Sequence, residues 1–138
     1  MAEYRKGAHT IYDIQYHFVW VTKYRYHVLV GEVGLRTREI IRQICAKQDI
    51  KILKGHISKD HIHILVSCPP KLSPSKIMQY VKGRSSRRLQ DEFTDLKKRY
   101  WGNHLWARGY FCATVGEMTQ AQIKEYIERH EDEGGWSN

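Results

Sequence analysis

The sequence predicts an α+β fold in which helices cover one face of a sheet and one further helix ends the chain. Three observations predict it. Alternating apolar residues mark strands, and apolar residues at a 3.6-residue period mark helices. The two kinds of segment follow one another in the order β-α-β-β-α-β-α. The third is size, because 138 residues with 41% hydrophobic positions are enough for one domain with its own core.

The first half of the chain predicts three strands and a helix. Residues Ile11 to Thr22 form a strand whose apolar positions alternate, and Leu35 to Lys47 form a helix with an apolar stripe that includes Leu35. Ile50 to Ser58 and His61 to Cys68 are short strands joined only by Lys59 and Asp60. A connection this short predicts an antiparallel hairpin.

The second half predicts two helices around one strand. Pro69 and Pro70 end the preceding strand. Ser73 followed by Pro74 is a typical helix start, and this helix continues to about Phe93. An aromatic loop then leads to a strand from Tyr110 to Val115. Thr119 and Gln122 have the spacing of a capping box, which opens a last helix that ends near Glu131.

The first six elements match the ferredoxin-like split β-α-β-β-α-β plan, and the seventh is an additional C-terminal helix. We find no internal repeat or linker, so residues 1–133 form a single domain followed by a short tail, residues 134–138. Many functions occur on this plan, and the fold alone therefore does not decide among them.

Composition narrows the function classes. Twenty-three Lys and Arg against 15 Asp and Glu give a net charge of +8, which favours a polyanionic partner, most often nucleic acid. A basic protein without such a partner is the alternative. No apolar run is long enough to span a membrane, and the first ten residues have no apolar signal core. Three widely spaced cysteines form neither a disulfide framework nor a metal pair, so we expect a cytoplasmic protein.

The pair His61 and His63 is the main candidate for chemistry. Residues two apart on a strand share a face, so the two imidazoles lie side by side while Ile62 and Ile64 face the core. Such a pair can bind one divalent cation, although two histidines on a solvent-exposed face are an ordinary alternative. Further ligands must come from elsewhere. His56 would lie opposite His63 in the hairpin.

The last helix supplies a second set of candidates. His130 follows Tyr126 by four residues, so both side chains project from one face of the helix. A tyrosine beside a metal ligand is the arrangement that a metal-assisted nucleophile requires, and a tyrosine packed against the sheet is the alternative. On periodicity alone, Tyr80, with Arg84 four residues later, is an equally good candidate.

Basic residues gather in two stretches. Residues 82–99 hold seven positive charges against three acids, and Lys23-Tyr24-Arg25-Tyr26 mixes cations with rings. Interleaved cations and aromatic rings suit single-stranded nucleic acid, in which phosphates and bases are both exposed. A solvated helix face is the alternative. The candidate DNA contacts are Lys23, Arg25, Lys82, Arg84 and Arg87.

Several motifs occur together in a fixed order along nearly the whole chain. They are Tyr16-His17-Phe18-Val19-Trp20, Lys23-Tyr24-Arg25, Asp60-His61-Ile62-His63-Ile64-Leu65, Lys82-Gly83-Arg84-Ser85-Ser86-Arg87, Leu105-Trp106, Gly109-Tyr110-Phe111, Thr114-Val115-Gly116 and Ile123-Lys124-Glu125-Tyr126-Ile127. This ordered set resembles the single-tyrosine transposases of bacterial insertion sequences, which belong to the HUH endonuclease superfamily.

The resemblance implies a mechanism. His61 and His63 would hold a divalent metal ion, Mg²⁺ or Mn²⁺, and Tyr126 would attack single-stranded DNA to leave a 5′-phosphotyrosine and a free 3′-OH. It also implies a homodimer whose subunits share active sites, and DNA hairpins at the element ends as partners. One departure stands out. The family commonly has glutamine four residues after the tyrosine, where this chain has His130. The third metal ligand is therefore either His130 or a water molecule.

Two other functions fit the same residues. A domesticated, repeat-associated HUH nuclease would keep the chemistry without a mobile element. A non-catalytic RNA- or DNA-binding module on the same plan predicts stacking rings on the third strand. That strand carries His61-Ile62-His63-Ile64-Leu65-Val66 instead, which argues against the module. A general metal hydrolase would leave the region around Tyr126 unexplained.

Overall fold

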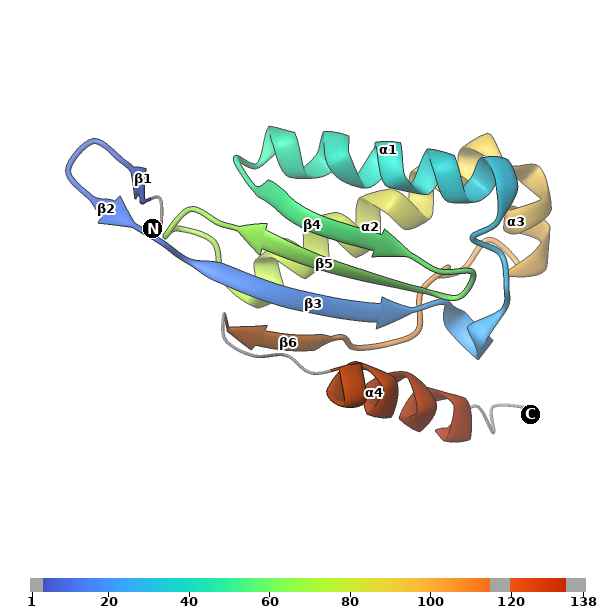
Figure 1. Cartoon of the computed structure of the whole chain (residues 1–138). Helices are drawn as coiled ribbons and strands as arrows, with labels where there is room; N and C mark the ends of the chain where they lie inside the picture. Colours follow the sequence, from blue (N-terminus) through green and yellow to red (C-terminus); the bar gives the residue numbers. More distant parts are fainter. Residues whose placement is uncertain (1–3, 115–119, 134–138) are drawn as a thin grey trace.

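The computed structural model describes residues 4–114 and 120–133. Four strands form an antiparallel sheet in the order β4-β5-β3-β6, which is the predicted ferredoxin-like plan. They are β3 (Gln15–Val21), β4 (Lys51–Ile57), β5 (His61–Ser67) and β6 (Phe111–Thr114). Helices α1 (Gly31–Lys47) and α2 (Pro74–Glu92) cover one face, and α4 (Gln120–Glu133) lies against the other (Figure 1).

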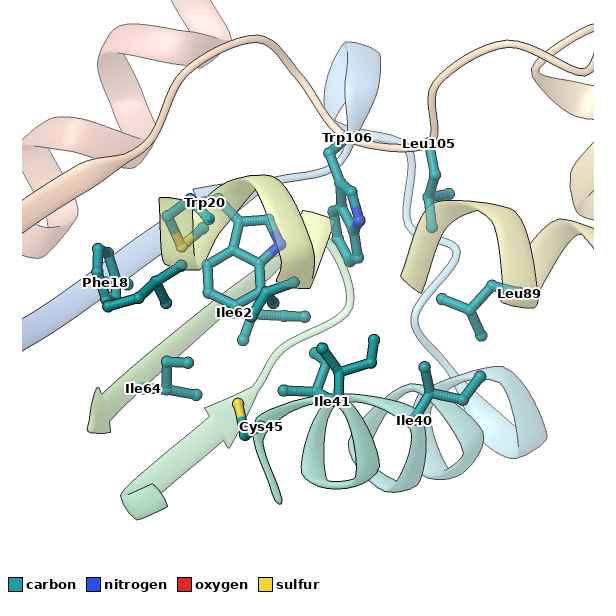
Figure 2. Close-up of a cluster of buried hydrophobic side chains, with 14 of the residues drawn as sticks. Phe18, Trp20, Ile40, Ile41, Cys45, Ile62, Ile64, Leu89, Leu105 and Trp106 are labelled. Carbon is teal, nitrogen blue, oxygen red and sulfur yellow. The ribbon is translucent and has the colours of Figure 1, made fainter. Parts of the chain in front are cut away.

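The main core lies between the sheet and helices α1 and α2. Phe18 and Trp20 of β3 are fully buried there, together with Ile62 of β5. Ile40 and Ile41 of α1 meet them from the other side, and Trp106 packs edge-on against Trp20 with ring centroids 5.8 Å apart (Figure 2). Because alternate residues of each strand fill this core, the residues between them face α4 or solvent.

The hairpin and the second helix start as the sequence predicts. Ile57 pairs with Ile62, and the Ser58 N–H donates to the His61 carbonyl, so β4 and β5 are joined by a tight turn at Lys59 and Asp60. The Ser73 hydroxyl accepts a hydrogen bond from the Lys76 N–H at 3.1 Å, which caps α2 ahead of Pro74.

Three details differ from the prediction. The first strand is divided, because β2 (Ile11–Tyr12) pairs with β1 (Arg5–Lys6) in a separate small hairpin before β3 begins. The predicted aromatic loop contains helix α3 (Thr94–Arg99), which buries Leu96 in the core. One buried residue gives no periodicity to detect. Leu35 is 71% exposed, because it lies off the stripe through which α1 packs.

Two further predictions lie outside the described residues. The capping box begins at Thr119, one residue before the first described residue of α4 at Gln120. The tail, residues 134–138, is outside as well. None of the helices among the described residues combines the length and the apolar run that a bilayer crossing requires.

Candidate active site

The face of the sheet opposite α1 and α2 carries the predicted histidine pair. Ile62 and Ile64 are 0% and 3% exposed on the core side, whereas His61 and His63 are partly exposed on the other side. The predicted division of this strand into a core face and a polar face is therefore confirmed. A strand's two-residue period is its physical cause.

Two further histidines lie beside this pair. The Nδ1 atom of His17 on β3 is 3.1 Å from the Nε2 atom of His63, close enough for a hydrogen bond between the rings. His56 lies opposite His63 in the register of β4 and β5, as predicted, and its Nε2 atom is 2.9 Å from the Ser58 hydroxyl. Three neighbouring strands thus contribute imidazoles to one face of the sheet.

Burial keeps two of these rings neutral. Desolvation lowers the pKa of His63, and the nearby His17, His56 and His61 lower it further. The pKa of His17 is lowered by desolvation and by the charge of Lys54. A neutral imidazole retains the lone pair that a metal ion binds.

Asp60 orients His61. Its carboxylate is 2% exposed, and Oδ1 lies 2.8 Å from Nδ1 of His61. Desolvation raises the Asp60 pKa, but hydrogen bonds from His61 and Arg25 outweigh it and bring the pKa to about 2. An ionised carboxylate only accepts hydrogen bonds, so Nδ1 of His61 is the donor to Asp60, and Nε2 is the ring nitrogen left to face a metal ion. A carboxylate that fixes an imidazole in this way is typical of metal-binding histidines.

Helix α4 places Tyr126 on the same face of the sheet. Its neighbour Ile127 is buried against Val19 and Val21, which lie opposite His63 and His61 in the register of β3 and β5. The Tyr126 ring packs edge-on against Phe111 of β6, with centroids 5.8 Å apart. The structure therefore brings the predicted nucleophile and the histidine pair to one face.

Tyr80, the alternative nucleophile, is on the opposite side. It belongs to α2 and packs at the edge of the main core. Lys76 and Arg84 lie over its ring at 5.4 and 4.6 Å from the centroid. These contacts indicate that Tyr80 is a packing residue.

A third metal ligand cannot be assigned from the described side chains. Position 130 belongs to α4, but the His130 side chain lies outside the described part of the chain. Among the described side chains no group of three His, Cys, Asp or Glu residues is arranged to hold a metal ion. The imidazoles of His61, fixed by a carboxylate, and of His63, whose pKa is lowered by burial, nevertheless fit two positions around a divalent cation.

The predicted DNA contacts fall into two groups. Lys23 lies near the site end of β3, with its ammonium over the Tyr24 ring, while Arg84 and Arg87 are exposed on α2. The other two are engaged within the protein. The Lys82 ammonium donates to the carbonyls of Ala107 and Gly109 at 2.9 and 2.7 Å, and burial lowers its pKa to about 8. Arg25 binds Asp60 and the Ile127 carbonyl.

Comparison with known proteins agrees with this arrangement. Residues 10–130 match the family described as IS200-like transposases. The chain belongs to that family. This transposase is 38% identical to the ISDra2 transposase TnpA of Deinococcus radiodurans over 130 residues, which are 94% of this chain and 93% of that one. It is 39% identical to the transposase for insertion sequence element IS200 of Salmonella typhimurium over 133 residues, which are 96% and 87% of the two chains.

Solved structures confirm the fold of the transposase. It superposes with a TM-score of 0.84 and 36% identity on a Deinococcus radiodurans crystal structure assigned as a transposase, covering 91% of this chain and 96% of that one. A REP-associated tyrosine transposase bound to a REP hairpin superposes with a TM-score of 0.56, over 99% and 76% of the two chains. At 15% identity, that second likeness concerns the fold alone. As a transposase, the chain is an enzyme of DNA cleavage and transposition.

The sequence does not indicate three contacts within this candidate site. The contact of His17 with His63 depends on the pairing of β3 with β5, which cannot be read from the sequence. The role of Asp60 has one available signal, a carboxylate directly before His61. The basic neighbours of Arg25 suggest a DNA contact and give no indication of a partner 35 positions away.

Proposed function

We propose that the transposase cleaves and rejoins single-stranded DNA at the ends of an insertion sequence through a covalent bond to Tyr126. The observation that supports it most directly is the position of α4, which brings Tyr126 to the face that carries His61 and His63. Tyr80 lies on the other side of the sheet.

The chemistry balances without an external energy source. The Tyr126 oxygen attacks the phosphorus of a phosphodiester, a new O–P bond forms, and the bond to the 3′ oxygen breaks. The phenol loses its proton, and the departing 3′ oxygen becomes a hydroxyl. A later attack by a 3′-OH on the phosphotyrosine rejoins the strands, because the covalent intermediate conserves the bond energy.

A divalent cation, Mg²⁺ or Mn²⁺, would offset the charge that develops on the scissile phosphate. His61 and His63 are the protein groups we assign to it, since one is held by Asp60 and the other is kept neutral by burial. Water or His130 would complete the set. If His130 contributes, metal preference shifts toward Mn²⁺ or softer ions, and a His130→Ala protein with unchanged metal dependence would contradict that assignment.

The DNA partners we propose are hairpins near the element ends, bound by the exposed cations Arg84 and Arg87 and by the partly exposed Lys23. Lys82 and Arg25 are weaker candidates, because both already bind protein oxygens. We further propose a homodimer that shares its active sites by exchanging α4. The fold neighbour bound to a REP hairpin supports the idea that this fold can present a surface to such a structure.

Covalent trapping tests the proposal. Labelled single strands from the gene's own flanks are incubated with the protein and Mg²⁺ or Mn²⁺, and then separated on a denaturing gel. Wild-type protein and the matched control Tyr80→Phe should give a shifted protein–DNA band. Tyr126→Phe, His61→Ala and a chelator should each abolish it. A band that survives Tyr126→Phe would refute the assignment of the nucleophile.

The same experiment distinguishes an insertion-sequence transposase from a repeat-associated nuclease. A repeat-associated nuclease would form the adduct with repeat hairpins rather than with strands that bound a mobile unit. Binding without any adduct would favour a non-catalytic role. The relatives at 38% and 39% identity are insertion-sequence transposases, which is why we favour mobility.

A further inference from the structure

Arg25 lies at a strained turn between the histidine face and α4. Tyr24 and Arg25 have φ angles of +60° and +52°, which place two successive non-glycine residues in the left-handed region. A side chain is disfavoured in this region because its Cβ comes too close to the following carbonyl oxygen. Such strain persists only where neighbouring contacts hold it. The Thr22 hydroxyl, which donates to the Tyr26 carbonyl at 2.8 Å, helps to close this turn.

The guanidinium joins two parts of the molecule. Its Nε and Nη2 atoms donate to Oδ2 of Asp60 at 3.0 and 2.6 Å. Its Nη1 atom donates to the backbone carbonyl of Ile127, 3.2 Å away in α4. The Arg25 and Asp60 side chains are 17% and 3% exposed, so little solvent competes for these bonds. Charge-assisted bonds in such surroundings are stronger than those on the surface.

The other oxygen of the same carboxylate holds His61. Oδ1 of Asp60 accepts from Nδ1 of His61 at 2.8 Å, which gives a continuous chain of bonds from Ile127 through Arg25 and Asp60 to His61. Ile127 directly follows Tyr126. The chain of bonds therefore connects the helix of the candidate nucleophile to a candidate metal ligand, and no part of it requires DNA.

We propose that Arg25 is a positioning residue that ties the docked position of α4 to the orientation of His61. This inference rests on the proposed function, since it assigns a use to Tyr126 and His61. The bond to the Ile127 carbonyl exists only while α4 is docked, whereas the two bonds to Asp60 do not involve α4. Arg25 thus favours the docked helix from the same carboxylate that orients His61. Lysine cannot replace it, because a single ammonium has no planar set of donors to reach both partners.

Hydrogen exchange of the metal-free, DNA-free protein tests the inference. In Arg25→Lys, the amides of α4 should exchange at least about ten-fold faster than in wild type, while those of α1 stay unchanged. Arg36→Lys is the matched control. Arg36 also binds a carboxylate through two nitrogens, to Glu92, but far from α4 on the surface of α1 and α2. That variant should leave α4 exchange at the wild-type rate.

Asp60→Asn examines the coupling at the middle of the chain of bonds, between Arg25 and His61. It should also speed exchange in α4, because Arg25 loses its anchor, and it should weaken Mn²⁺ binding by about ten-fold, as measured by electron paramagnetic resonance. Unchanged α4 exchange in Arg25→Lys, or equal acceleration throughout the chain, would overturn the inference. Wild-type exchange at rising denaturant provides a second measurement if a variant does not fold. The α4 amides and the Arg25 Nη1–H, which donates to the Ile127 carbonyl, must then open together, and separate openings overturn the inference.

The hydrogen-exchange result is independent of the covalent-trapping result. If Tyr126→Phe abolishes the adduct but Arg25→Lys leaves α4 exchange unchanged, the proposed function stands and the positioning role fails. If the adduct survives Tyr126→Phe, the proposed function fails, whatever the exchange of α4.

Discussion

The two faces of the sheet use the same strands for different purposes. Toward α1 and α2, β3 and β5 present Phe18, Trp20 and Ile62, which are fully buried in a mainly apolar layer. Toward α4, the intervening residues are His17, His63 and His61, interrupted by valines. One face therefore supplies the apolar burial that stabilises the fold, and the other presents the groups that could do chemistry.

The faces also differ in how firmly they hold their helices. Among the described residues, the core under α1 and α2 contains 20 buried side chains, and the cluster under α4 contains three, Val19, Val21 and Ile127. Since burial of apolar surface is the main stabilising term, the described apolar contacts hold α4 far less firmly than those that hold α1 and α2. A helix that is held weakly by apolar contacts depends more on a polar contact such as that of Arg25.

The largest effect is expected from His63→Ala. Removing the proposed metal ligand should forfeit several kcal/mol of transition-state stabilisation, so the rate of adduct formation should fall at least about 100-fold. The Tm should change by no more than about 3 °C, because the ring is partly exposed on the polar face. Calorimetry measures the Tm, and the trapping gel measures the rate of adduct formation. A large loss of Tm would mean that the polar face also stabilises the fold, which would contradict the division of roles between the two faces.

Ile62→Ala is the matched change one residue earlier on the opposite face. It removes a fully buried side chain from the core, which typically costs about 2–5 kcal/mol of the free energy of unfolding. The Tm should fall by roughly 10 °C or more. Adduct formation by the fraction that remains folded, measured well below the Tm, should stay within about three-fold of wild type. A selective loss of activity at full stability would contradict the division of roles.

The sequence was sufficient for whatever depends on local periodicity. Period-two alternation divided β5 into Ile62 and Ile64 on one face and His61 and His63 on the other, and the short turn at Lys59 placed His56 opposite His63. These relations involve neighbours along the chain, so stereochemistry alone decides them.

Non-local relations could not be predicted. His17 meets His63 across 46 positions, and Arg25 meets Asp60 across 35, because the register of β3 with β5 is decided by the packing of the whole sheet. Basic residues near a predicted nucleic-acid site look alike in a sequence, whether they face solvent, as Arg87 does, or an internal carboxylate, as Arg25 does.

Lys82 is a partly buried charged residue at the edge of the face covered by α2, so its titration tests how burial affects stability there. Burial lowers its pKa from 10.5 to about 8, so the unfolded chain binds the proton more tightly than the folded one. Between pH 8 and pH 10.5 the unfolded state therefore holds more protons than the folded state. The free energy of unfolding consequently increases as the pH rises through this interval. Neutral lysine still has two N–H groups for the carbonyls of Ala107 and Gly109.

The measurement is urea unfolding of wild type and Lys82→Met at pH 7 and pH 9.5, because the difference between the two proteins cancels the other titrations. Wild type should gain on the order of 1 kcal/mol relative to Lys82→Met over this interval, after allowance for partial solvent screening. A gain by the methionine variant instead would mean that the folded protein stabilises the ammonium.

The smallest effect is expected from Arg36→Ala, which removes an ion pair that resembles the one at the site. Arg36 lies 2.5 and 3.1 Å from the oxygens of Glu92 and links α1 to α2, but both side chains are about one-third exposed. Water and salt screen such a pair, so the Tm should change by no more than about 2 °C, and less still at high salt. Arg25 and Asp60 make the same kind of contact at 17% and 3% exposure. If Arg36→Ala proved as destabilising as Arg25→Ala, burial would not be what gives the site pair its importance, and the reason for assigning it a positioning role would be lost.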